Sequence, residues 1–214
     1  GGKTTIKVEV LGGGRPGSEV LCHAQAGGEI FAVHARGRID ASLPRPASSS
    51  LDTILARCSK KLAVDELVDA AKARGYGLAC FANLVSGWEG PAEILLETEI
   101  PGGASAGEGW AGLAEVSDAI PLAGGALQSN SDDALALPTI FGRSMCWGSA
   151  TGKVWFHGQL SDSGNGVTVR LLGSDGDELA ISEDDAFEAI GDWSKLATPV
   201  AIDGGTELWA PDGG

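Results

Sequence analysis

The chain has 214 residues, 43% of them hydrophobic, and its 29 acidic and 15 basic residues give a formal net charge of −14. This length can bury a core, and this apolar content excludes wholesale disorder. The negative charge disfavours contact with phosphate backbones and anionic lipid, and no run of about 18 apolar residues is present to cross a bilayer. We therefore expect no nucleic-acid partner and no membrane insertion.

The first 44 residues predict an N-terminal β segment. Apolar and polar residues alternate strictly over residues 4–10, which is typical of a half-buried strand. A glycine-rich loop follows, and residues 19–24 and 29–35 predict two further strands on either side of a Gly-Gly turn.

Residues 45–85 predict a helix–helix–strand unit. Apolar residues recur at helical spacing after Leu51, which follows a run of serines able to cap a helix. A second helix is predicted over Val64–Arg74, with acidic residues near its start and Gly75 just after its end. The apolar run Tyr76–Leu84 then predicts a buried strand.

The next region, residues 86–138, has a different composition. Ile94–Ile100 predicts a strand, but Pro101–Asp133 is rich in small residues and shows little periodicity. Long connections without secondary structure are uncommon in compact domains unless they are functional or disordered. We expect this Gly/Ala-rich arm to be extended or mobile and to make contacts between chains.

The last segment, residues 139–214, predicts a β-sandwich-like or barrel-like unit. Lys153–Leu160, Val167–Leu172 and Leu179–Ile181 read as consecutive strands joined by acidic turns rich in glycine, aspartate and asparagine. The predicted fold class is α+β and mainly β, with antiparallel sheets, this C-terminal unit and a small helical insertion.

No spacing of reactive side chains identifies a catalytic, cofactor or metal site, so we predict none of these. The four cysteines lack a C-x-x-C pair, which favours buried free thiols, although their even number permits two disulfides. The three histidines fall in predicted strands without a metal-binding motif. The cysteines are Cys22, Cys58, Cys80 and Cys146, and the histidines are His23, His34 and His157.

Three tryptophans, Trp110, Trp147 and Trp155, are candidate interaction residues. Trp155 falls on the strand face opposite Val154 and Phe156, beside a histidine. A tryptophan on the outer face of a sheet needs a cover, and that cover is either a partner or another layer of the same chain. The partners we expect are copies of this chain or other structural proteins.

From composition, the sequence favours a non-enzymatic, self-assembling or surface-interaction protein, such as a phage capsid or tail accessory component, in a virion or outside the cell. The first alternative is an extracellular β module that binds glycans or calcium through its acidic turns, since carboxylates are calcium ligands. The second alternative is a hydrolase or metal enzyme whose residues converge only in three dimensions. No sequence motif distinguishes these classes.

Overall fold

A computed structural model describes residues 4–26, 32–40, 44–45, 47, 49–73, 84–100, 127, 135–148, 152–161 and 166–190. The chain divides into two compact units, Gly1–Pro44 with Ser194–Gly214, and Arg45–Trp193. Both are built mainly of antiparallel strands with few helices, so the predicted mainly β, α+β class is confirmed. No described helix has the length and apolar character needed to cross a membrane.

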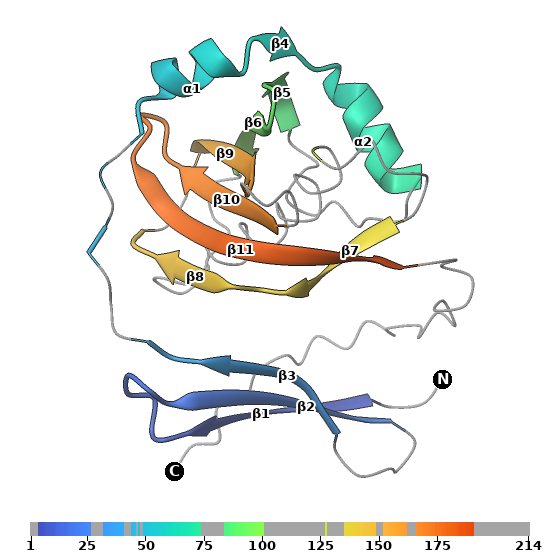
Figure 1. Cartoon of the computed structure of the whole chain (residues 1–214), viewed down its shortest axis with the longest axis vertical. Coiled ribbons are helices and arrows are strands. Elements are labelled where there is room, and N and C mark those ends of the chain that lie inside the picture. The colour runs from blue at the N-terminus through green and yellow to red at the C-terminus, as the bar shows by residue number, and fades with distance from the viewer. Residues whose placement is uncertain are drawn as a thin grey trace. The chain divides into compact units, whose positions relative to one another are not determined.

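The first unit contains a three-stranded antiparallel sheet in the order β1-β2-β3 (Figure 1). Its strands are β1 (Thr4–Leu11), β2 (Glu19–Ala26) and β3 (Ala32–Arg38). Four glycines of the β1–β2 turn have positive φ, which explains why glycine dominates that turn. In register, Val8 lies opposite Cys22, and Cys22 lies opposite Ala35, so one face of this sheet is apolar.

The second unit contains an eight-stranded sheet in the order β4-β5-β6-β9-β10-β11-β7, with β8 paired to β11. The C-terminal meander predicted from the sequence is present as β9, β10 and β11 (Figure 1). The central neighbours β6 and β9 are far apart in the chain and pair over eight residues. The strands are β4 (Lys60–Lys61), β5 (Leu84–Glu89), β6 (Glu93–Ile100), β7 (Leu135–Ile140), β8 (Arg143–Cys146), β9 (Gly152–Leu160), β10 (Gly166–Leu172) and β11 (Glu178–Ile190).

Two helices precede most of this sheet, α1 (Leu51–Arg57) and α2 (Val64–Ala73), at the positions expected from the sequence. Of the predicted strand Tyr76–Leu84, only Leu84 is described, as the first residue of β5. The expected arm Pro101–Asp133 lies outside the described residues except for Leu127.

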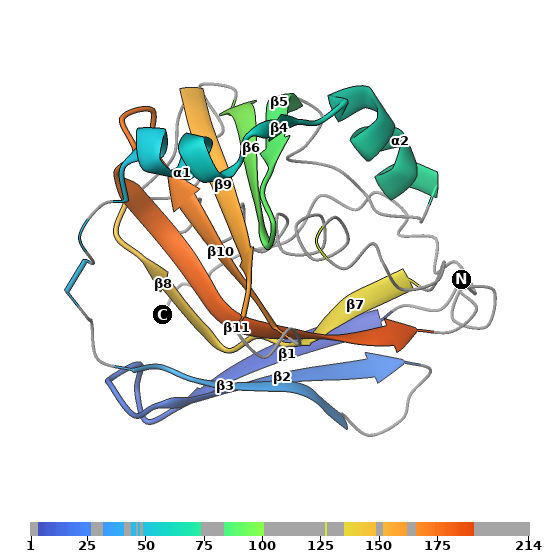
Figure 2. The ribbon, with the colours of Figure 1, turned by 45° about the horizontal axis from the view of Figure 1, so that its top comes forward.

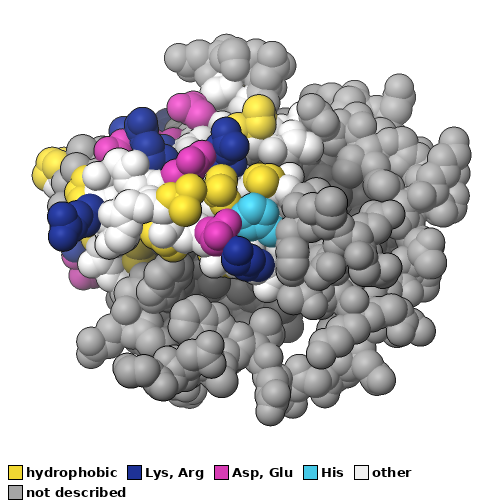
Figure 3. Space-filling view, turned by 90° about the horizontal axis from the view of Figure 1, so that it is seen from below, with side chains coloured by type: hydrophobic (Ala, Val, Ile, Leu, Met, Phe, Trp, Pro, Cys, Tyr) yellow, Lys and Arg dark blue, Asp and Glu magenta, His cyan; other side chains and the backbone are white. Residues whose placement is uncertain are grey.

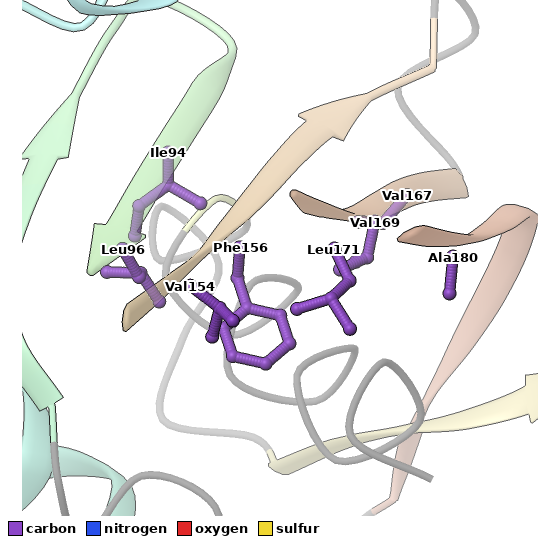
Figure 4. Close-up of a cluster of buried hydrophobic side chains, with 8 residues drawn as sticks. All are labelled: Ile94, Leu96, Val154, Phe156, Val167, Val169, Leu171 and Ala180. Carbon is purple, nitrogen blue, oxygen red and sulfur yellow. The ribbon is translucent and has the colours of Figure 1, made fainter. Parts of the chain in front are cut away.

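One face of the eight-stranded sheet carries the larger hydrophobic core. Its eight buried side chains come from β6, β9, β10 and β11 and are at most 2% exposed (Figure 4). Fully burying one such side chain contributes about 1.5–3 kcal/mol, so this face supplies much of the unit's stability. The members are Ile94, Leu96, Val154, Phe156, Val167, Val169, Leu171 and Ala180.

The opposite face of the same strands is covered by α1. Ile54 and Cys58 pack there against Leu95, Trp155 and Leu172, which belong to β6, β9 and β10. Figure 2 shows α1 lying across β9 and β10. Because side chains alternate along a strand, residues two positions away from Leu95, Trp155 and Leu172 point to this same face, and several of them are polar.

Candidate functional site

Alternation along β6, β9 and β10 places a line of ionisable and amide side chains under α1, which we call the polar row. It begins at the C-terminal end of α1, crosses the sheet and ends on β11. Each member is joined to at least one other member by a hydrogen bond or an ion pair. The members are Arg57, Glu93, His157, Gln159, Arg170 and Glu178.

Glu93 is the centre of the polar row. The Arg57 guanidinium donates to it through Nε at 2.6 Å and through a terminal nitrogen at 2.8 Å, one bond to each carboxylate oxygen. His157 Nε2 lies 2.8 Å from Oε2, and the Gln159 amide approaches the same oxygen at 3.5 Å. The bond from Arg57, followed by that from His157, holds the pKa of Glu93 below its usual value despite its burial. Glu93 is therefore an ionised carboxylate inside the fold.

His157 is 2% exposed, and this burial lowers its pKa even though the neighbouring Glu93 acts in the opposite direction. The imidazole is therefore neutral near pH 7. With Glu93 as an acceptor beside Nε2, the single ring proton belongs on that nitrogen. Nδ1 then carries a lone pair, and this buried atom has no hydrogen-bond partner among the described residues.

The other half of the polar row lies on β10 and β11. Arg170 donates to the Gln159 amide oxygen at 2.6 Å, and its Nε lies 3.7 Å from Glu178 Oε2. Glu178 is 2% exposed, and burial raises its pKa while Arg170 opposes that rise. One oxygen of Glu178 is left without a partner in the described part of the chain.

A third buried carboxyl, Asp185, lies outside the polar row on β11, next to an irregular point in the strand where Asp184 has φ of 59°. Asp185 Oδ1 accepts from Ser182 Oγ at 2.9 Å and from the Gly142 backbone N–H at 3.2 Å. Burial raises the pKa of Asp185 to about 6, and its other oxygen has no described partner. This carboxyl ties the β7–β8 turn to β11.

A neutral histidine oriented by a carboxylate is the arrangement used for general-base catalysis. Here, however, His157 is 2% exposed and Arg57 donates to both oxygens of Glu93, so the imidazole is shielded from solvent and its carboxylate is already occupied. Cys58 in the same layer has its pKa raised to about 11 by burial, which makes it a poor nucleophile. Among the described residues, no cluster of three or more histidine, cysteine or acidic side chains is arranged to hold a metal. The polar row has the properties of a structural network.

The structure separates the side chains that the sequence singled out. Trp155 is 6% exposed and packs against Ile54 and Cys58 at α1, so its cover is another layer of the same chain. It also contacts Trp88 of the same sheet, with ring centroids 5.7 Å apart. Lys153 Nζ lies 4.6 Å from the centroid of the Trp155 ring. Trp147 is partly buried, and Trp110 lies outside the described residues. An interaction role for these tryptophans stays a prediction.

The structure also keeps Cys146 and His157 apart. Cys146 packs on the larger core and donates to the Gly148 carbonyl, while His157 lies on the opposite face of the sheet. Cys22, Cys58 and Cys146 are free thiols, and Cys80 is outside the described residues. The sequence pattern placed His157 beside Trp155, but nothing in it indicated the partner Glu93, which is 64 residues away.

Comparison with known proteins identifies the fold as that of a class of enzymes. No family model and no curated protein matches the chain. Solved structures do match, and they include several dehydratase domains of polyketide synthases, which have a hotdog fold that is α+β and mainly β.

Three of these structures show the extent of the similarity. The dehydratase domain from the CurK module of curacin polyketide synthase has a TM-score of 0.70 and 17% identity, over 87% of this chain and 69% of that one. An inactive mutant of the CurJ dehydratase in complex with compound 21 has a TM-score of 0.70 and 19% identity, over 91% and 70%. The dehydratase domain of a mycocerosic acid synthase-like polyketide synthase has a TM-score of 0.63 and 20% identity, over 91% and 70%.

These matches correct the function expected from composition. A virion or capsid accessory protein, and a non-enzymatic structural role in general, were wrong predictions, because the fold is that of enzymatic domains. The prediction relied on small-residue content, acidity and missing motifs. These properties do not identify a fold. Alternation of apolar and polar residues is enough to specify a sheet of this kind, and the same fold is found here at 17% sequence identity.

Proposed function

We propose that this chain is a dehydratase-type domain that removes water from a hydroxyacyl chain of the polyketide kind. The observation that carries the proposal is the fold: 87% of the chain superimposes on the CurK dehydratase domain with a TM-score of 0.70. The substrate class comes from the names of these structures, all of which are polyketide synthase dehydratases.

Elimination of water from a hydroxyacyl thioester needs two groups. A base removes the proton next to the thioester carbonyl, and an acid protonates the departing hydroxyl. The CurK dehydratase has a histidine-to-phenylalanine variant and an aspartate-to-asparagine variant, each named inactive. We infer that dehydration by this chain would require the same two kinds of side chain.

We do not assign these roles to the buried histidine and aspartate of the described residues. His157 is buried and bonded to Glu93, and Asp185 accepts bonds from Ser182 and from the Gly142 N–H of the β7–β8 turn. His157 lies on β9 and Asp185 on β11, with β10 between them. The hydrogen bonds of each side chain give it a structural role. The proposed activity therefore rests on the fold and not on His157 and Asp185 as a catalytic pair.

The test is turnover of a soluble thioester. The purified chain is incubated with a 3-hydroxyacyl pantetheine thioester, and the loss of one water is followed by mass spectrometry. The reverse hydration of the matching enoyl thioester is measured in parallel, because an elimination catalyst accelerates both directions. We expect conversion in both directions above a heat-denatured control.

Two control variants and a binding titration complete the test. His157→Gln and Asp185→Asn should keep the wild-type rate when folded, because both residues are structural. A folded chain without turnover in either direction would overturn the dehydratase proposal. Shifts of backbone amide signals on titration with the non-hydrolysable amide analogue of the thioester would then identify an acyl-binding domain that shares the fold and lacks the elimination.

A further inference from the structure

Helix α1 lies across β9 and β10 like a strap, and both of its ends contact neighbouring turns (Figure 2). At its start, the β10–β11 turn comes so close that a Cβ atom added at Gly176 would lie 3.1 Å from Leu51 Cγ. At its end, a Cβ atom added at Gly90 would lie 2.9 Å from the carbonyl oxygen of Arg57. Between these contacts, Ile54 is fully buried against the sheet. The helix is therefore closed on this face of the sheet.

The strap has little stability of its own. It has seven residues, and its N-cap Ser50 makes no side-chain capping bond. Helices this short are marginal in water and depend on packing. The Ile54 amide donates to the Ser50 carbonyl at 3.1 Å, and the Cys58 amide donates to the Ile54 carbonyl at 2.9 Å. These two amides therefore report whether α1 is formed, and weaker packing should open α1 before the sheet.

His157 is linked to α1 through Glu93. The imidazole shares the α1 face of the sheet, because His157 lies opposite Leu95 and two residues from Trp155, and both of these belong to the cluster that α1 completes. Its Nε2 atom contacts Glu93, and Glu93 accepts two bonds from Arg57, the last residue of α1. A change of charge at His157 therefore acts on the contact that holds the end of α1.

The charges on this face disfavour a cation at His157. Glu93 favours the imidazolium, whereas Arg170 and Arg57 oppose it, and burial outweighs the attraction of Glu93. The ionisable side chains of this layer come from every element around the imidazole. They are Arg57 and Cys58 from α1, Glu93 and Glu97 from β6, Lys153 from β9, Arg170 from β10 and Glu178 from β11.

The atom that would take up the proton is His157 Nδ1, because Nε2 already donates to Glu93. Nδ1 is buried and has no hydrogen-bond partner in the described part of the chain. A proton on Nδ1 would create a buried N–H donor without an acceptor, on a ring that has become charged. Both changes cost free energy in a site without water. Detachment of α1 would let water reach the ring and would remove this cost.

We propose that α1 is an acid-released strap, which stays closed on the sheet while His157 is neutral and detaches when Nδ1 is protonated, with β9 and β10 still paired. Burial lowers the pKa of His157, so the closed state binds the proton less tightly than the open state. The closed state is therefore favoured above about pH 6.5, the ordinary histidine pKa, and acid favours opening. Burial raises the pKa of Glu178, so this group opposes the effect. The proposal is independent of the dehydratase activity.

Amide hydrogen exchange of the whole chain, followed by NMR, tests the proposal. The reporters are the amides of Ile54 and Cys58, and the references are the amides of the β9–β10 ladder. Protection factors are compared, because they remove the pH dependence of the chemical exchange rate. Protection of the reporters should fall by up to about 25-fold from pH 7 to pH 5, which is the limit for one histidine that protonates normally only in the open state. The reporters should also be less protected than the references, and low urea should not change their exchange, as expected for a local opening.

His157→Gln should abolish most of this fall, because glutamine still donates to Glu93 but does not titrate. His23→Gln is the matched control and should keep the full fall. His23 also lies 2.9 Å from a glutamate, Glu9, which Lys7 contacts too, but on the sheet of the first unit. In Figure 3 a histidine lies among acidic, basic and hydrophobic side chains on one face of the molecule.

Two further variants complete the test. Glu178→Gln removes the opposing group and should not reduce the fall in protection. Arg57→Gln removes the link between α1 and Glu93, so it should lower the protection of the reporters at pH 7 and leave the references unchanged. This variant keeps the proposal testable if His157→Gln does not fold.

A fall in protection that is confined to α1, is kept in His23→Gln and is lost in His157→Gln would establish the acid-released strap. Equal protection and equal urea dependence of α1 and the β9–β10 ladder would overturn it, because α1 would then open only when the whole unit unfolds. Constant protection from pH 7 to pH 5 in the wild type would also overturn it. The same fall in His157→Gln as in the wild type would show that another group carries the pH dependence.

Discussion

The Nε2 atom of His157 lies 2.8 Å from Oε2 of Glu93, and both side chains are buried although 64 residues separate them in the chain. Antiparallel pairing of β6 with β9 makes the contact, because Glu93 lies opposite Gln159 and Leu95 lies opposite His157. Arg57 closes the network from α1. The pair therefore connects the helix to the centre of the sheet.

Glu93→Gln should lower the free energy of unfolding by about 1–3 kcal/mol. The substitution removes the charge that the Arg57 guanidinium and the His157 ring both contact, and a charge-assisted bond is worth more than a neutral one. The loss is smaller than for a wholly buried pair because the Arg57 side chain is 44% exposed. Urea denaturation followed by tryptophan fluorescence measures the change.

The control is Glu89→Gln, which breaks an ion pair with Lys60 in which the side chains are 39% and 75% exposed. Exposed pairs contribute little, so this variant should stay within about 0.5 kcal/mol of the wild type. Equal losses in the two variants would show that Glu93 stabilises the fold no more than an exposed ion pair does.

His157→Gln should remove a pH dependence of stability. Because burial lowers the pKa of His157 in the fold, the unfolded chain binds the proton more readily. The stability that neutral His157 contributes is fully present above about pH 6.5, its unfolded pKa, and is lost as pH falls below it. Glutamine still donates to Glu93 but does not titrate, so the acid-side loss attributable to residue 157 should disappear.

The measurement is a set of urea titrations between pH 5 and pH 8. Asp185 titrates in the same range with the opposite sign, so both chains are compared in an Asp185→Asn background. If the two curves remain parallel from pH 5 to pH 8, His157 is not held neutral by burial.

Much of the fold follows from local patterns in the sequence. Alternation around Phe156 and Val169 predicted the β9–β10–β11 meander, and acidic residues followed by Gly75 bounded the helix that became α2. Alternation and helix-end residues are local patterns, so each of these strands and helices can be predicted from its own residues.

The polar row could not be predicted in the same way. Its members come from α1, β6, β9, β10 and β11, and they meet only because β6 pairs with β9. Pairing partners far apart in a sequence are selected by the whole core, and Glu93 alone is indistinguishable from a solvated glutamate. The same limit explains the incorrect prediction of function, since the fold of the dehydratase domains persists at 17% identity without a local motif to mark it.

Gly142→Ala should lower the stability of the second unit by about 1–3 kcal/mol. A Cβ atom at residue 142 would overlap the backbone carbonyl oxygen of Glu183, which is part of β11 and cannot move without disturbing the sheet. The shift would also stretch the bond from the Gly142 N–H to Asp185. The midpoint of urea unfolding reports the loss.

Gly148→Ala is the matched control for that variant. Its added Cβ would meet only the end of the Leu179 side chain, at 3.2 Å, and this side chain can rotate away. We expect a change below about 1 kcal/mol. A larger loss in Gly148→Ala than in Gly142→Ala would contradict the close approach of the β7–β8 turn to β11.

Asp185→Asn should stabilise the protein above about pH 6 and have little effect near pH 4. Burial raises the pKa of Asp185 to about 6 from an ordinary value of 3.8, so the folded chain holds the proton more tightly than the unfolded chain. The stability from the protonated group is present below about pH 4 and is lost as pH rises towards 6. A difference of about two pKa units corresponds to about 3 kcal/mol, which is the upper limit for the gain.

Asparagine suits this position because its amide oxygen still accepts from Ser182 and from the Gly142 N–H. Asp185→Ala removes that acceptor and should destabilise the fold by about 1–3 kcal/mol at every pH. Asp184→Asn is the control, and it should change stability by less than about 0.5 kcal/mol. Residue 184 is exposed, and asparagine tolerates its left-handed backbone conformation. If Asp185→Asn were as destabilising at pH 8 as Asp185→Ala, residue 185 would act as an ionised carboxylate, and the raised pKa inferred from its burial would be wrong.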